Sequence, residues 1–277
     1  MEKQKPVEWD LTGTDVSLEE LASFEKNCLK PVSYVSELPK DEKRKEEIKE
    51  ISETLADYIA NRCDIDIYKK LIPTENFHFF TSRDFKKVAD ANCRKNSVGF
   101  VDGLNNIIAK EDSALSNTLY TINHELLHVV SYSKGLVEKT GSGLKIIEMR
   151  TGFRDIVQDM LKEFNEGFTE LINYYIIKNR WTSNDTLKTA SSKVLCAYFD
   201  IVLFLRDMFI DIDKKAVCNY GSNSLSLALR DYITGDYYSL KLISDTYGYL
   251  NFDRIASIKN EKGYIKNLRK SIGLNKK

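Results

Sequence analysis

The sequence predicts an α+β fold in which a small mixed sheet precedes a larger set of helices. Short runs of aromatic and β-branched residues at 76–81 and 97–110 are typical of strands. Apolar residues recur every three or four positions from 48 to 59, from 115 to 130 and from 164 to 175, which is the spacing of amphipathic helices. Hydrophobic residues make up 42% of the chain and charged residues 30%, which favours a folded globular protein over a disordered one.

The 277 residues are expected to form one unit with two lobes, because a chain of this length can bury a sizeable core. Residues 1–39 would be an N-terminal extension with a short helix. Residues 40–135 would form a lobe containing the strands and the helix of 115–130. Residues 136–277 would form a mainly helical lobe.

The N-terminal extension is expected to start extended or poorly ordered and then form one peripheral helix. Ser17-Leu18-Glu19-Glu20 has the spacing of a capping box, which opens a helix that would end near Asn27. A second helix follows, with an apolar stripe from Ile48 to Ile59. The basic residues 43–45 precede that stripe among acidic neighbours, so a solvated face is favoured over a nucleic-acid site.

The strands of the first lobe are expected at 76–81, 97–102 and 105–110. The last two flank Asp102-Gly103, a dipeptide typical of hairpin turns. His78 lies in the first strand, where a lone histidine among aromatic residues is more often structural than catalytic.

The helix predicted at 115–130 contains His124-Glu125-Leu126-Leu127-His128. Its apolar stripe faces a core, and both histidines lie on another face. Residues four apart on a helix lie one turn apart, so both imidazoles can reach one zinc ion, with Glu125 on the same side. The alternative is a pair of polar histidines on a core helix with no ion.

A second helix carries Asn165-Glu166-Gly167-Phe168-Thr169-Glu170. Its apolar stripe leaves Glu163, Glu166 and Glu170 together on another face. A solvated charged face is one explanation. The other is that Glu166 is a third zinc ligand, that water takes the fourth position, and that Glu170 holds a histidine ligand in place.

These two motifs resemble those of the gluzincin-type zinc metalloproteases, the group that includes thermolysin-like and aminopeptidase N-like enzymes. The resemblance covers motif order over residues 98–178 and implies a zincin-like fold with Zn²⁺ held between the lobes. It gives His124, His128 and Glu166 the role of ligands, Glu125 that of general base and Glu170 that of a partner to a histidine ligand. Two features depart from the commonest pattern: the gap of 166 − 128 = 38 positions, and a glutamate at 170 where aspartate is frequent.

In that group, the strand before the zinc helix binds the substrate backbone as an added strand. The matching segment here is 105–109, which makes Asn106, Ile107 and Ile108 the expected substrate-binding residues. The alternative is an interior strand with no free edge.

Beyond the zinc helix, glycines punctuate residues 135–152, and 144–149 are expected to form a strand. This insertion would be a cleft wall, a movable lid or a plain connecting hairpin. A further helix is expected to begin at a cap at 183–185 and to become almost wholly apolar from 194 to 205, and more helices are expected over 225–233 and 236–246. The apolar run is shorter than the roughly twenty residues that cross a bilayer, so no membrane span is expected.

The function that these observations predict is a zinc-dependent metallopeptidase acting on a peptide or protein substrate. A catalytically silent zinc-stabilised binding module, or a zinc hydrolase of another amide or ester, is the alternative. The 41 basic and 41 acidic side chains give no reason to expect nucleic acid or an anionic membrane as partner. Five scattered cysteines without a Cys-x-x-Cys pair, and a start without an apolar signal, favour the cytoplasm, or secretion if an export signal has been removed. The residue that stabilises an oxyanion, among 15 tyrosines, and the oligomeric state are left unassigned.

Overall fold

The computed structural model describes residues 8–11, 15–27, 35–92, 94, 97–102, 105–112, 115–141, 143–180, 198–215 and 223–274. It has the expected α+β class, with 61% helix and small sheets. The strands are β1 (Glu8–Asp10), β2 (Phe77–Phe80), β3 (Gly99–Val101), β4 (Ile107–Lys110), β5 (Ser133–Thr140), β6 (Gly143–Thr151) and β7 (Arg154–Asp155). The helices of the first lobe are α1 (Leu18–Asn27), α2 (Glu42–Cys63), α3 (Ser82–Ala91) and α4 (Leu115–Val130), with short 3-10 turns at Tyr68–Lys70 and Thr74–Asn76. The remaining helices are α5 (Lys162–Arg180), α7 (Phe199–Lys215), α8 (Ser224–Thr234), α9 (Tyr238–Tyr247), α10 (Tyr249–Ala256) and α11 (Lys262–Ser271).

The first sheet has the strand order β2-β4-β3. β2 runs parallel to β4, and β3 runs antiparallel to it, as the predicted hairpin requires. Ile107 pairs with Phe77 on one side and with Val101 on the other, so β4 is the central strand. The expectation that Asn106, Ile107 and Ile108 bind substrate as an edge strand is therefore wrong, because the backbone of Ile107 and Ile108 already pairs on both sides.

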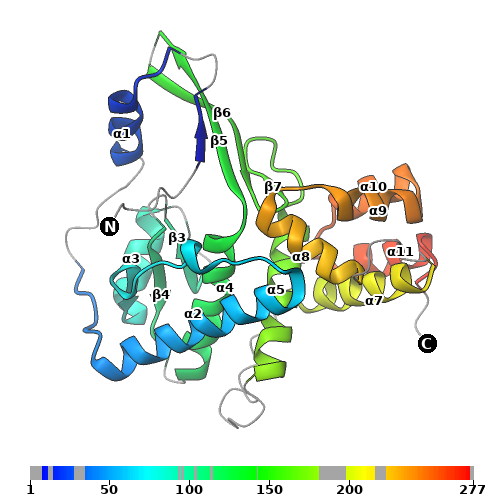
Figure 1. Ribbon diagram of the computed structural model, residues 1–277, viewed down its shortest axis with the longest axis horizontal. Helices are drawn as coiled ribbons and strands as arrows, with labels where there is room; N and C mark the ends of the chain where they lie inside the picture. The colour runs from blue at the N-terminus through cyan, green and yellow to red at the C-terminus, as the bar shows by residue number, and fades with distance from the viewer. Residues whose placement is uncertain are drawn as a thin grey trace.

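A long hairpin of β5 and β6 forms an arm that rises above the body (Figure 1). β1 adds to β5 as a parallel strand, and β7 pairs with the last residues of β6. The predicted strand at 144–149 is confirmed within β6. The capping box of α1 is also confirmed, because Ser17 N donates to Glu20 Oε2 at 2.9 Å and Glu20 N donates to Ser17 Oγ at 3.1 Å.

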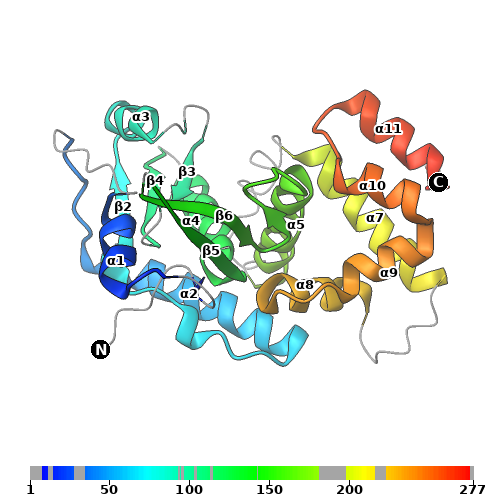
Figure 2. The ribbon, with the colours of Figure 1, turned by 90° about the horizontal axis from the view of Figure 1, so that it is seen from above.

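One hydrophobic core connects the two lobes. It contains residues of α2, β2, β4, α4, α5 and α7–α11, and so crosses the predicted boundary at 135/136. Seen from above, α5 and α8 lie between the first sheet and the group formed by α7, α9, α10 and α11 (Figure 2). The arm has a separate small cluster of apolar side chains, Val16, Leu21 and Val137 with Leu11, Leu144 and Ile146.

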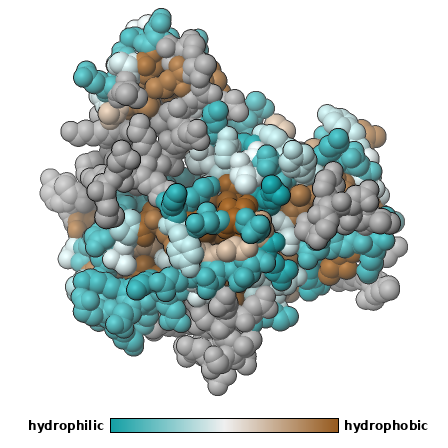
Figure 3. All heavy atoms as spheres, in the orientation of Figure 1, coloured by the Kyte–Doolittle hydropathy of each residue, from teal (hydrophilic) through white to brown (hydrophobic). Residues whose placement is uncertain are grey.

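α2 and α7 show why these helices form where they do. α2 has the predicted apolar stripe buried in the core, and the side turned toward the viewer is hydrophilic (Figure 3). Its basic residues contact carboxylates, with Arg44 bound to Glu111 by two hydrogen bonds of 3.1 and 2.8 Å. α7 buries most of one face and belongs to the core, while the predicted cap at 183–185 lies outside the described residues. Among the described residues, no helix has the length and apolar character to cross a membrane.

Candidate metal centre

α4 presents both histidines of the predicted motif to one point. His124 and His128 lie one turn apart, and their Nε2 atoms are 3.1 Å from each other. Their apolar neighbours, such as Ile122 and Leu126, are fully buried on the opposite side. The two histidines, four residues apart, therefore lie together on one face of α4, as their spacing predicts.

Glu166 completes the cluster from α5. Its Oε2 atom is 3.5 Å from His124 Nε2 and 3.5 Å from His128 Nε2. Among the described residues, this is the one group of three or more histidine, cysteine, aspartate or glutamate side chains whose ligand atoms all lie within 4.8 Å of one another. The insertion between the two motifs does not separate them, because the arm projects away from the body.

The donor set fits a divalent transition metal. Zinc with bonds of about 2.0–2.1 Å and tetrahedral angles places its ligand atoms about 3.3–3.4 Å apart, close to the separations of 3.1, 3.5 and 3.5 Å here. If both imidazoles carry their proton on Nδ1, two lone pairs and a carboxylate oxygen face one another. Such a group requires a positive charge, which either protons or a metal ion can supply.

Models of known protein families, curated proteins and solved structures give no match to this chain. A function is therefore inferred from the residues of this cluster and from the side chains that surround it.

Glu170 stands beside His124, on the side away from Glu166. Its Oε1 atom is 3.3 Å from His124 Nδ1, an ion-pair distance at which the angle falls short of a hydrogen bond. Its Oε2 atom accepts a hydrogen bond of 2.5 Å from the hydroxyl of Tyr120. A carboxylate at Nδ1 favours the proton on that nitrogen, and so leaves the lone pair of Nε2 free.

The charges of the cluster shift the pKa of His124 and the pKa of Glu166. Burial lowers the pKa of His124, but Glu170 and Glu166 outweigh it, and the pKa lies well above 6.5. Burial raises the pKa of Glu166, but His128 and His124 outweigh it, and the pKa lies well below 4.5. Glu166 is therefore an ionised carboxylate at neutral pH, as a metal ligand must be.

Glu125 lies beside this group without belonging to it. It is 8% exposed and is not among the convergent ligand atoms. A side chain at Gly99 of β3 would meet Thr121 Cγ2 first, and Glu125 Cγ and Oε1 at 3.2 Å, so the glycine leaves room for both of these side chains of α4. Burial raises the pKa of Glu125, which brings the group closer to the range in which a carboxylate exchanges a proton at neutral pH.

Two tyrosines near the cluster were not identified in the sequence. Tyr120 is four residues before His124, a helical spacing that places the two on one face of α4 and could have revealed it. Tyr232 comes from α8, and its hydroxyl is 3.3 Å from His128 Nδ1. Because Tyr232 is 104 residues from His128, no spacing rule could have found it.

Other polar side chains lie outside the group of His124, His128 and Glu166. The rings of Tyr174 and Tyr175 contact each other, at a centroid distance of 5.8 Å. Burial, and next the charge of Glu166, raise the pKa of Tyr198, so its phenol lies within the electrostatic reach of the cluster. His78 pairs with Glu37 at 3.0 Å, as a structural histidine would. Cys63 is a free, half-buried thiol, and the other cysteines lie outside the described residues.

Proposed function

We propose that this protein is a zinc-dependent metallopeptidase of the gluzincin type with a zincin-like fold. The observation that carries the proposal is the convergence of His124 Nε2, His128 Nε2 and Glu166 Oε2 on one point, with Glu125 buried beside them but outside the group. Three protein ligands and one open position are typical of catalytic zinc, whereas structural zinc is closed by four protein ligands.

Zinc bound there would act as a Lewis acid that polarises a substrate carbonyl and lowers the pKa of water to about 7. Glu125 would take a proton from the attacking water on its carboxylate and pass that proton to the leaving amine. His124 and His128 would keep their protons on Nδ1. Glu170 would hold His124 in this state, supported by the hydroxyl of Tyr120.

The edge position of β3 in the first sheet supports a peptide as substrate. Among the residues that the structure describes, β3 pairs with β4 alone, and Gly99 on β3 lies against Glu125. An extended peptide that added to β3 as a further strand would run past the carboxylate of the proposed base. β3 thus takes the role that the sequence assigned to 106–108.

The buried position of Glu125 also favours a metallopeptidase over a catalytically silent zinc-stabilised module. A purely structural site has no need for a carboxylate that is shielded from solvent beside the ligands and does not join them. A zinc hydrolase of another amide or ester would keep the same residues and differ in what the edge of β3 accepts.

The change Glu125→Gln tests the proposed base, because it nearly preserves the size of the side chain and removes its ability to accept a proton. We expect the variant to bind zinc and to unfold at the temperature of the parent, and its turnover of a cleaved peptide to fall about 10²- to 10⁴-fold. Zinc content, melting temperature and cleavage of a peptide library are to be measured on the same preparations.

Glu163→Gln is the matched control, since Glu163 lies on the same face of α5 and is not among the convergent ligand atoms. It should keep both zinc and activity. Undiminished cleavage by Glu125→Gln would exclude Glu125 as the base, and loss of zinc from that variant would make it a ligand.

A further inference from the structure

The hydroxyl of Tyr232 reaches the outer nitrogen of His128, and we propose that Tyr232 is a positioning residue of the metal site. Its oxygen accepts a hydrogen bond from the N–H group of His128 Nδ1, and this hydrogen bond directs the lone pair of His128 Nε2 toward His124 and Glu166. The inference deepens the proposed metal site and rests on it. It assigns a function to α8, which carries none of the residues of the two sequence motifs.

The direction of each hydrogen bond follows from a count of protons. Thr169 Oγ1 donates its one proton to the carbonyl oxygen of Asn165, at 2.9 Å. Thr169 Oγ1 must then accept from the hydroxyl of Tyr232, which is 2.9 Å away. That leaves the Tyr232 oxygen as an acceptor for His128 Nδ1, at 3.3 Å. A proton on Nδ1 makes Nε2 of His128 the nitrogen with the lone pair.

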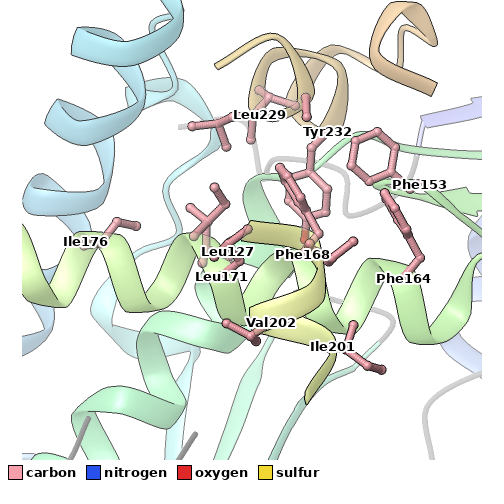
Figure 4. Packing of buried hydrophobic residues seen from close by; sticks show 14 of the residues in the cluster. Leu127, Phe153, Phe164, Phe168, Leu171, Ile176, Ile201, Val202, Leu229 and Tyr232 are labelled. Carbon is pink, nitrogen blue, oxygen red and sulfur yellow. The ribbon is translucent and has the colours of Figure 1, made fainter. Parts of the chain in front are cut away.

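The ring of Tyr232 is fixed by its surroundings. It is fully buried, and its centroid lies 5.6 Å from that of Phe153 and 5.4 Å from that of Phe168. These rings pack between α8 and α5 (Figure 4). Gly152 has φ +54°, and a side chain there would meet Tyr232 Cδ2 at 2.8 Å, so only a glycine leaves space for the ring.

The helix that carries Tyr232 is attached to the end of α4. The carbonyl oxygen of Tyr232 accepts a hydrogen bond of 2.9 Å from Tyr132 N, immediately after the histidine helix. Lys70 Nζ donates to Val130 O at 3.2 Å and to Ile233 O at 2.9 Å, and so binds the C-terminal ends of α4 and α8 with one cation. The distance between the phenol and His128 is therefore set by several contacts that do not involve a metal.

This geometry distinguishes positioning from direct participation in the reaction. Tyr232 contacts Nδ1, while Nε2 is the atom of His128 that faces the cluster. The side chain of Tyr232 is fully buried, and its hydroxyl contacts the nitrogen of His128 that is turned away from the cluster.

The test compares Tyr232→Phe with Tyr247→Phe. Both changes remove one buried hydroxyl and keep the ring, but the hydroxyl of Tyr247 bonds to Asp211 at 2.8 Å, away from the cluster. Zinc affinity, measured by competition with a chelator, should fall about 10- to 100-fold in Tyr232→Phe and stay unchanged in Tyr247→Phe.

Nitrogen-15 spectra of the histidine rings give a second readout that needs neither zinc nor activity, and the chain has three histidines to assign. In the zinc-free parent, we expect the Nδ1-protonated form of neutral His128, and in Tyr232→Phe a loss of that preference. Unchanged zinc affinity together with an unchanged spectrum would overturn the inference. So would an equal loss of zinc affinity in Tyr247→Phe, which would indicate a general effect on folding. A parent that binds no zinc would refute the proposed function, while the spectra would still decide the hydrogen bond.

Discussion

At the scale of single residues, three carboxylates and two imidazoles lie close together in a buried part of the protein. This ratio gives the centre an excess of negative charge. Glu125, Glu166 and Glu170 all contribute to raising the pKa of His124 against the effect of burial. Without an ion, protons compensate for this excess of negative charge. With an ion, the same negative charge attracts the metal. A proton competes with the metal, because a ligand nitrogen must lose its proton before it can bind.

The pH dependence of zinc binding follows from this competition. Below its raised pKa, His124 is protonated in the zinc-free protein and zinc must displace that proton, so zinc affinity should rise by about tenfold per pH unit. A histidine with the ordinary value of 6.5 would reach its plateau near neutrality, whereas the rise here should continue above it. Chelator competition at about pH 6, 7 and 8 measures the slope. A plateau at the pH that an ordinary histidine gives would contradict the raised pKa of His124.

At the scale of elements, a glycine next to Glu166 allows α7 to approach α5 closely. Gly167 follows Glu166 on α5, and a side chain there would meet Ile201 Cβ at 3.2 Å and Leu205 Cδ1 at 3.4 Å on α7. The glycine of the second motif therefore has a packing role that is independent of the role proposed for Glu166 as a ligand. Close contact between α5 and α7 holds Glu166 in the body of the protein.

The substitution Gly167→Ala should destabilise the fold by about 1–3 kcal/mol, because the added methyl group overlaps α7. Gly263→Ala is the matched control, since Gly263 lies in α11 and nothing lies within 4 Å of the position of its Cβ. That change should be neutral or stabilise by up to about 1 kcal/mol through helix propensity. Urea unfolding of both variants measures the difference. Equal stability of Gly167→Ala and the parent would contradict this prediction, and would show that α7 can move away without a loss of folding stability.

Elements that depend on local spacing could be predicted from the sequence. The stripe from Leu119 to Val130 and the capping box at Ser17 belong to single helices, where residue i and residue i+4 must be neighbours. The order of strands could not be predicted, because no pattern in Ile107 or Ile108 indicates which strand lies in the centre of a sheet. The place of Tyr232 was also beyond prediction, since it depends on the packing of α8 against α4.

At the scale of the whole molecule, one core extends from α2 to α11 and includes both ligand helices. α4 belongs to the predicted N-terminal lobe and α5 to the predicted C-terminal lobe, so the proposed metal centre lies between parts of the chain that share one core. Binding of an ion to this centre should therefore stabilise the whole body of the protein and not one lobe alone.

Calorimetry tests this coupling. We expect a single main unfolding transition, which zinc shifts to higher temperature by an amount equivalent to about 2.7 kcal/mol at a free concentration 100 times the Kd. His128→Ala should unfold in one transition as well and lose most of the shift, because one of three ligands is missing. Two transitions of which zinc moves only one would contradict a shared core.

The measurement that tests the central claim most directly is the zinc content of the purified chain and of two variants on one helix. The parent and Glu163→Gln should each contain about one zinc per chain after dialysis, and Glu166→Gln should contain far less, because two imidazoles alone bind zinc much more weakly than two imidazoles and a carboxylate. Glu166→Gln that retains the zinc of the parent, or a parent that contains none after incubation with zinc, would contradict the claim that His124, His128 and Glu166 form a metal site.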